Sequence, residues 1–186
     1  MTMKAWRLDR LGGHLRLENV PMPEVRPGSV LVHVEASTLM SYIKPYVEGR
    51  LPPYHAPSGG FTPGGNCVGT IETAGKDVWQ LAPGQRVLVS SLFRSSENVA
   101  DPAQILIGVT SFGPDSEKVQ ADWPDGTLAE YVLLPASSVV PADGFEDNRS
   151  KWLLVYSFQN ALSGHTNSES KVHCPRTAMQ AMAQSV

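Results

Sequence analysis

Apolar residues occur along the first 146 residues in short runs that glycine and proline separate. Residues 3–8 and 15–20 flank Gly12 and Gly13, a pattern typical of a β-hairpin. Residues 21–29 are rich in proline and indicate a link. Apolar or β-branched runs that border turns predict strands within residues 30–37, 66–75, 82–91 and 126–135, and residues 137–144 close this part. The pattern therefore predicts a mainly β fold, a partly open barrel or a sandwich.

Helical signals are few and short. Residues 41–48, which Gly49 follows, predict one or two helical turns, although Pro45 limits this segment to an opening turn or a kink. Residues 92–124 interrupt the strand pattern, and the segment after Asp101 and Pro102 is compatible with a helix. We interpret this stretch as a surface insertion, with a functional loop as the alternative. Residues 150–164 form an apolar run with Ser150 as a candidate N-cap, and a polar tail follows.

These patterns divide the chain into two parts. Residues 1–146 form the β-rich domain, and residues 147–186 contain the helix-like segment and the C-terminal tail. The whole chain has 186 residues, which is enough for one full-sized core or for one domain with an appendage.

Composition and charge exclude several classes of function. Hydrophobic residues make up 41% of the chain and charged residues 18%, which fits a globular protein. A net charge of -3 offers no basic surface, so we expect no nucleic-acid partner. We find neither an apolar run long enough for a bilayer nor a signal-peptide pattern, and we therefore expect a cytoplasmic protein without a membrane partner.

The two cysteines provide no metal-binding pattern. Cys67 and Cys174 are far apart, form no CxxC pair and are too few for a four-thiolate zinc lobe. We interpret Cys67, at the start of a predicted strand, as a small buried apolar residue. Cys174 belongs to the polar tail and is expected to be an exposed thiol.

Three blocks of sequence, in order, resemble one known family. They are "GSVLVHVEASTLM...YVEGRLPP", "TPGGNCVGTIETAGKDVWQLAPGQRVLV" and "GTLAEYVLLP". Together they resemble the N-terminal catalytic domain of the medium-chain dehydrogenases/reductases, the group of zinc-type alcohol dehydrogenases and quinone reductases. The resemblance covers roughly residues 3–145. It implies a GroES-like fold, a partly open β-barrel with short helices.

The residues that would bind the family's catalytic zinc are replaced. Met40 stands where the resemblance implies a cysteine ligand, and Ile43 stands where an aspartate is usual. Gly64, Gly65 and Asn66 match the family's Gly-His-Glu turn. Because a thioether is a poor zinc ligand and glycine has no side chain, we expect no metal site and a zinc-independent protein.

The resemblance also implies NAD(P)H as the hydride donor, which the family holds in a Rossmann domain. No G-x-G-x-x-G pattern follows residue 145, so we expect no Rossmann domain and no cofactor bound by this chain alone. We interpret the chain as an isolated substrate-binding domain, truncated before the nucleotide-binding domain and not expected to be active alone.

One residue is a candidate for catalysis. Tyr42 lies two residues after Met40, where zinc-dependent relatives commonly carry a hydroxyl for proton transfer, and a phenol can protonate a developing alkoxide or enolate. The alternative is that Tyr42 only packs at the mouth of the barrel. The cleft around it is predicted to include the following residues: Met40, Ser41, Tyr46, Tyr54 and Asn66.

Other functions remain open from the sequence. The domain could be a non-catalytic module that self-associates, a protein that binds a small molecule in the old cleft, or a truncated product without a selected role. A second copy or another protein could cover the surface that a nucleotide-binding domain normally covers. The apolar residues 152–162 could also cover that surface.

Overall fold

The computed structural model describes residues 1–113 and 115–142. The predicted helix over residues 150–164 and the second part, residues 147–186, lie outside this range. The described strands are β1 (Thr2–Arg7), β2 (Arg16–Pro21), β3 (Ser29–Ser37), β4 (Cys67–Ala74), β5 (Arg86–Val89), β6 (Leu92–Arg94), β7 (Gln104–Leu106), β8 (Thr110–Ser111), β9 (Tyr131–Pro135) and β10 (Val139–Pro141). The helices are α1 (Ile43–Val47), α2 (Ser116–Asp122) and the 3₁₀ turn η1 (Ala136–Ser138).

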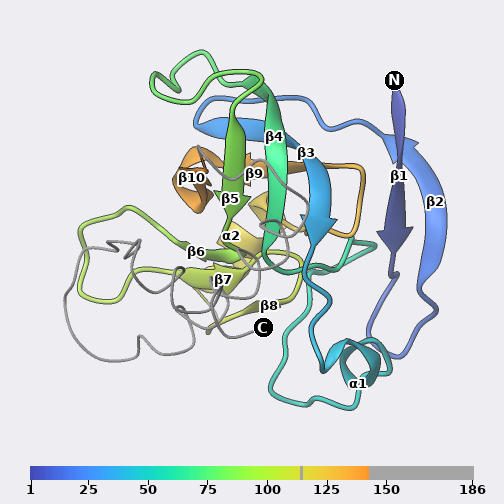
Figure 1. Ribbon diagram of the computed structural model, residues 1–186. Coiled ribbons are helices and arrows are strands. Elements are labelled where there is room, and N and C mark those ends of the chain that lie inside the picture. Colours follow the sequence, from blue (N-terminus) through green and yellow to red (C-terminus); the bar gives the residue numbers. More distant parts are fainter. Residues whose placement is uncertain (114, 143–186) are drawn as a thin grey trace, which may run out of the picture.

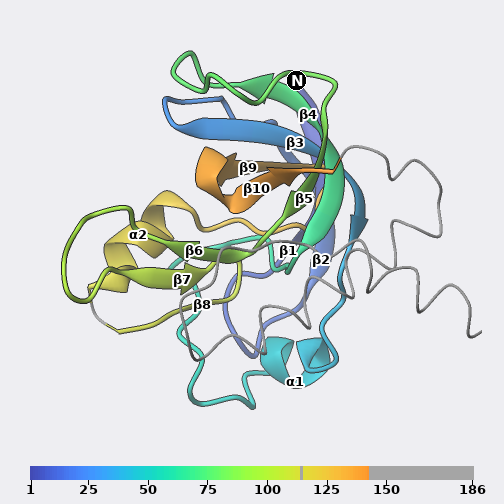
Figure 2. The same ribbon diagram turned by 60° about the vertical axis from the view of Figure 1, so that its left-hand side comes forward.

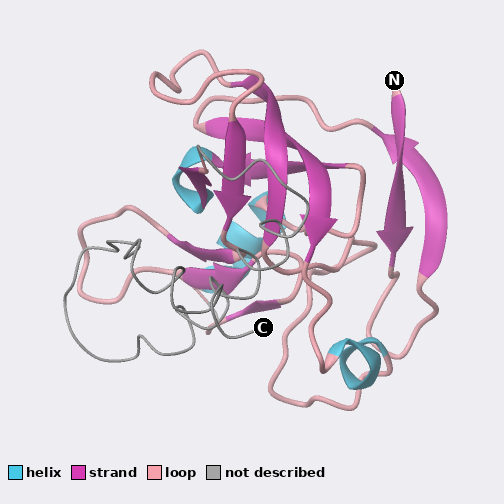
Figure 3. Ribbon diagram, viewed as in Figure 1, coloured by secondary structure: helices cyan, strands magenta, loops and turns pink. Residues whose placement is uncertain are grey.

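A five-stranded antiparallel sheet, in the order β10-β5-β4-β3-β9, forms the centre of the domain. The sheet curls around one side of the core, as a comparison of Figures 1 and 2 shows. Its inner side chains form a buried cluster that includes Val30, Val32, Ile71, Val87 and Leu134. The prediction of a mainly β fold with short helices is confirmed, and Figure 3 shows how few residues are helical.

The N-terminal hairpin is the predicted one. β1 pairs with β2 in antiparallel register, from Thr2 opposite Pro21 to Arg7 opposite Arg16. The other edge of β1 contacts the segment before β9, because the Trp6 amide donates to the Leu128 carbonyl at 2.9 Å. Leu8 and Phe61 then exchange two backbone hydrogen bonds, so β1 holds the turn at residues 61–66 in place.

An ion pair reinforces this connection. The Arg7 guanidinium contacts the Asp125 carboxylate, which also accepts a hydrogen bond from the Thr62 amide at 2.7 Å. Arg7 further donates to the Thr62 hydroxyl at 3.2 Å and to the Gly60 carbonyl. The first strand, the turn at residues 61–66 and the loop at residue 125 are therefore joined by one polar network.

The interpretation of residues 92–124 needs a correction. The helix with which the segment after Asp101 and Pro102 is compatible does not form there, since β7 begins at Gln104 and joins a three-stranded sheet in the order β6-β7-β8. The physical reason is burial with a period of two, because Ile105 and Ile107 are both buried in the core. The helix of this stretch is α2, which begins at Ser116.

The predicted strand over residues 126–135 is shorter than expected. β9 begins only at Tyr131, because the preceding residues bond to the turn at residues 61–66 instead. The Gly126 amide donates to the Thr62 carbonyl at 2.7 Å, and the Leu128 amide donates to the Pro63 carbonyl at 3.0 Å. In the part of the chain that the structure describes, no helix is long and apolar enough to cross a membrane.

Candidate functional site

Two segments far apart in the sequence meet at the turn over residues 61–66. The backbone of Gly64 passes so close to Thr127 that a Cβ atom on Gly64 would lie 2.1 Å from the Thr127 nitrogen. The Thr127 hydroxyl donates to the Gly65 carbonyl at 2.9 Å and accepts from the Gly65 amide at 3.1 Å. Only glycine therefore fits at Gly64. The next residue of the turn, Gly65, is held by the Thr127 hydroxyl at both its amide and its carbonyl.

Met40 lies directly against this turn. A Cβ atom on Gly65 would be 3.7 Å from the Met40 Cγ atom and 3.8 Å from its sulfur. Met40 is 7% exposed. The fold therefore brings together the two positions at which the family resemblance implies a cysteine and a histidine ligand, and the Met40 side chain occupies the space beside Gly65.

A cluster of three tyrosines extends from Met40. The rings of Tyr42 and Tyr54 have centroids 5.6 Å apart, and those of Tyr46 and Tyr54 are also 5.6 Å apart, edge to face. All three pack on the hydrophobic cluster that contains Met40, Leu8, Phe61 and Val109. Ser41, between Met40 and Tyr42 in the chain, is exposed. The structure thus brings four of the predicted site residues into one cluster.

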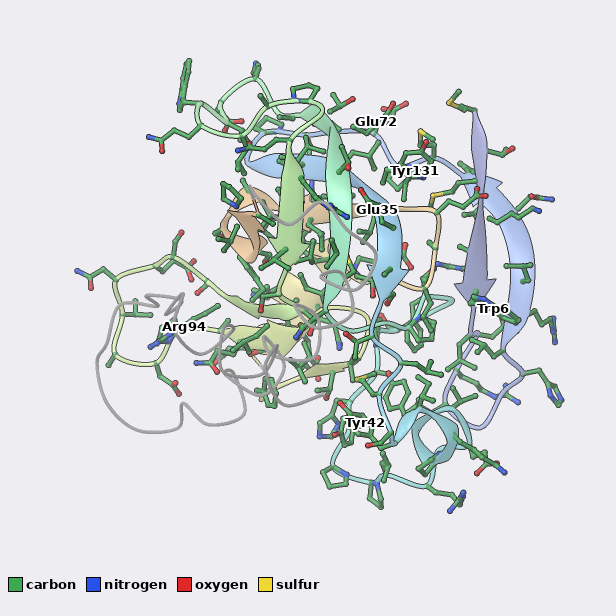
Figure 4. All side chains as sticks on the ribbon, viewed as in Figure 1. Trp6, Glu35, Tyr42, Glu72, Arg94 and Tyr131 are labelled. Atoms are coloured by element: carbon green, nitrogen blue, oxygen red, sulfur yellow. The ribbon has the colours of Figure 1, made fainter. Side chains whose placement is uncertain are left out.

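The three tyrosines have different surroundings. Tyr46 is fully buried, and its hydroxyl donates to the Val109 carbonyl at 2.6 Å. Tyr42 lies partly buried beside α1 (Figure 4). Burial raises the pKa of the Tyr42 phenol above that of free tyrosine, and the hydrogen bond and charge of Tyr54 raise this pKa further. Tyr42 therefore stays protonated at neutral pH, so its phenol can donate a hydrogen bond or a proton but does not act as a general base.

Asn66 has a different environment from the tyrosines. Its side-chain oxygen accepts hydrogen bonds from the Ser91 amide at 2.9 Å and from the Ser91 hydroxyl at 3.1 Å. Its backbone carbonyl accepts from the Thr38 amide at 2.9 Å. Asn66 is 7% exposed, and its side chain ties the turn to the residues that follow β5.

Thr38 is a residue of this region that the sequence analysis missed. Its hydroxyl oxygen is buried, and it has no hydrogen-bond partner among residues 1–113 and 115–142. A buried hydroxyl without a partner costs free energy, so this atom is a candidate contact for a bound molecule. The only signal in the sequence that Thr38 belongs to this site is its position two residues before Met40.

The donor atoms near Met40 do not fit a zinc ion. Met40 offers a thioether, Gly65 offers no side chain, and the Asn66 side-chain oxygen already accepts two hydrogen bonds from Ser91. Within the described residues, no three histidine, cysteine, aspartate or glutamate side chains lie close enough together to hold a metal ion. Cys67 is 1% exposed and burial raises its pKa, which confirms the interpretation of this residue as a small buried apolar side chain.

The curled, mainly antiparallel sheet with its glycine turn beside Met40 defines a class of domain. It does not by itself define an enzymatic activity. The comparisons with known proteins identify that class. The family model "Alcohol dehydrogenase GroES-like domain" matches residues 26–144. The chain belongs to this family, and the predicted GroES-like fold is confirmed.

Two curated relatives are alcohol dehydrogenases. The protein of Moraxella sp. (strain TAE123) is 31% identical over 137 residues, and the match covers 74% of this chain and 39% of that protein. The protein of Cupriavidus necator is 28% identical over 152 residues, with coverage of 74% and 40%. The chain thus spans about two fifths of the length of the curated relatives it matches.

Solved structures show the same fold. The cobalt- and zinc-bound alcohol dehydrogenase of Pyrobaculum aerophilum has a TM-score of 0.59 at 21% identity, covering 77% of this chain and 42% of that one. An alcohol dehydrogenase of Escherichia coli CFT073 complexed with NADH has a TM-score of 0.64 at 16% identity, covering 88% and 45%. The metals and NADH belong to those proteins.

Proposed function

We propose that this chain is the substrate-binding domain of an alcohol dehydrogenase-like oxidoreductase that works without catalytic zinc. The observation that carries the proposal is the contact of Met40 with Gly65. Neither residue supplies a zinc ligand, and the Met40 side chain lies in the space beside the glycine.

Two hydroxyl groups near Met40 could bind the substrate oxygen in place of a metal. Thr38 contributes a buried hydroxyl without a partner among the described residues, and Tyr42 contributes a phenol that remains protonated at neutral pH. In this proposal both donate hydrogen bonds to a carbonyl oxygen, and Tyr42 supplies the proton when that carbonyl is reduced. Tyr46 and Tyr54 then form the wall behind Tyr42.

NAD(P)H supplies the hydride in the family to which the chain belongs. No Rossmann fold is present among the described residues, and nothing near Met40 offers a phosphate-binding glycine turn at a helix N-terminus. We therefore propose that the hydride donor is held outside residues 1–142, and that this domain contributes substrate orientation and proton transfer.

Substrate binding in the presence of EDTA tests this proposal. Saturation-transfer NMR of the whole chain with a panel of aldehydes, enones and quinones is expected to detect at least one ligand without metal. Tyr42→Phe is expected to lower the affinity for that ligand by about 3- to 10-fold, the effect of losing one hydrogen bond. Tyr131→Phe, on β9, is the control and should leave the affinity unchanged.

Two results would contradict the proposal. If compounds bind only after zinc is added, the domain depends on metal. If no compound of the panel binds under either condition, the alternative of a non-catalytic module that associates with itself or with another protein becomes the better account.

A further inference from the structure

The outer edge of β2 is unpaired among the described strands. In its two-stranded sheet β2 pairs only with β1, and Figure 1 shows it at the right-hand margin of the molecule. The Met22 amide donates to the Met1 carbonyl at 3.1 Å, so these two residues form a hydrogen-bonded pair. Every second pair along the hairpin is then hydrogen-bonded as well. Arg16, Glu18 and Val20 therefore direct their backbone groups to β1, while those of Leu17 and Asn19 face outward.

The same edge carries apolar side chains. Leu17 lies directly opposite Trp6 in the hairpin register, and both stand on the face away from the buried residues Met3 and Ala5. Leu17 is 54% exposed and Trp6 is 42% exposed. Figure 4 shows Trp6 near the end of β1. Unpaired backbone groups beside exposed apolar side chains favour the addition of another strand.

Charge determines which strand fits this edge. Arg16 and Glu18 flank Leu17, are both exposed and form no ion pair with any described residue. We propose that a second copy of this chain adds its own β2, antiparallel, with Leu17 opposite Leu17 of the second copy. In that register Arg16 of each copy faces Glu18 of the other, in the pairs where side chains approach most closely.

The alternative registers are less favourable. A shift that centres the pairing on Glu18 places two carboxylates opposite each other, which is destabilising. A shift toward the end of the strand brings in Pro21, which has no amide to donate. Charges on an edge strand often only prevent association, but here the two signs are complementary in one symmetric register.

The pairing also compensates an unfavourable feature of the hairpin. Arg7 and Arg16 lie directly opposite each other, and Arg7 already has Asp125 as its ion-pair partner. Glu18 of the second copy would give Arg16 a carboxylate on its other side. The product is a continuous four-stranded sheet with Trp6 and Leu17 of both copies in one apolar row. This inference does not depend on the proposed catalytic role.

Charge reversal tests the register. Sedimentation equilibrium of the whole chain is expected to give twice the 20.1 kDa of one chain. Arg16→Glu and Glu18→Arg should each produce a monomer, because each places like charges opposite each other, and the double variant should restore the dimer. Glu72→Arg, an exposed charge reversal on β4, is the matched control and should remain dimeric.

The position of the symmetry axis can be tested with a crosslink. In a Cys174→Ser background, Leu17→Cys should form an oxidised dimer, because its Cα atoms would be about 5.5 Å apart. Asn19→Cys should not, since it faces residue 15 of the second copy. A monomeric wild-type chain, a dimer that survives both single reversals, or a double variant that stays monomeric would each overturn the proposal.

Discussion

Tyr46 links the packing behind the candidate site to a segment far along the chain. Its side chain is completely buried, and its hydroxyl donates at 2.6 Å to the carbonyl of Val109, a residue 63 positions later in the chain. Burial is also the main cause of the raised pKa of this phenol. The hydrogen bond thus connects the helix α1 with the insertion and fixes the ring against which Tyr54 packs.

Tyr46→Phe is therefore expected to lower the free energy of unfolding by about 1–3 kcal/mol, because the buried Val109 carbonyl loses the hydroxyl that donates to it. Urea denaturation followed by circular dichroism measures this. Tyr131→Phe, which removes a hydroxyl from a half-buried ring, should change the stability by less than about 0.5 kcal/mol. Equal losses of unfolding free energy in both variants would contradict this prediction, because the hydrogen bond to Val109 would then contribute no more than the Tyr131 hydroxyl does.

Part of this site could be predicted from the sequence. The family resemblance matched Met40 and Gly65 to two ligand positions of one metal site, and the structure places them beside each other. It could not indicate Thr38, whose significance lies in a hydroxyl without a partner among the described residues. It also could not indicate that Ser91 would bond to Asn66, since the two residues come from different strand ends. Such partners are set by tertiary packing and leave no local pattern.

At the scale of elements, the glycine turn and the loop at Gly126–Thr127 determine the geometry. Gly64, Gly108 and Gly126 pack backbone to backbone, and a Cβ atom on Gly108 would lie 2.6 Å from Gly126. Gly108 also has a φ of +71°, which favours glycine further. Three elements can approach closely here only because none of the three residues has a side chain.

Substitution of two neighbouring glycines should therefore change the stability by very different amounts. Gly64→Ala is expected to lower the free energy of unfolding by about 3 kcal/mol or more, because its Cβ would overlap the Thr127 backbone. Gly65→Ala should change it by less than about 1 kcal/mol, since its nearest neighbour would be 3.5 Å away. Thermal and urea denaturation of both variants measure the difference. Similar stabilities would contradict the described packing.

The elements also show where a sequence pattern is informative. The hairpin, the central strands and α1 were predicted because each has its own turn residues and period. The segment after Asp101, compatible with a helix from its sequence, is a strand instead. Gln104–Leu106 is too short for its period to be recognised, and its conformation is set by pairing with β6 and β8. The strand expected from residue 126 begins later, because Gly126 and Leu128 bond to the glycine turn.

At the scale of the whole molecule, the domain has the barrel of a dehydrogenase without metal ligands at the matching positions. We predict that the purified chain binds neither NADPH nor NADH, because its described residues provide no nucleotide-binding fold. A titration followed by nicotinamide fluorescence checks this. Micromolar binding would contradict the prediction and would indicate a cofactor site formed in another way.

Zinc binding tests the central claim most directly. The whole chain, equilibrated with zinc, dialysed and measured by mass spectrometry, is predicted to retain no zinc above the buffer blank. One zinc per wild-type chain would contradict the account, since the chain would then hold a metal that it is predicted not to bind.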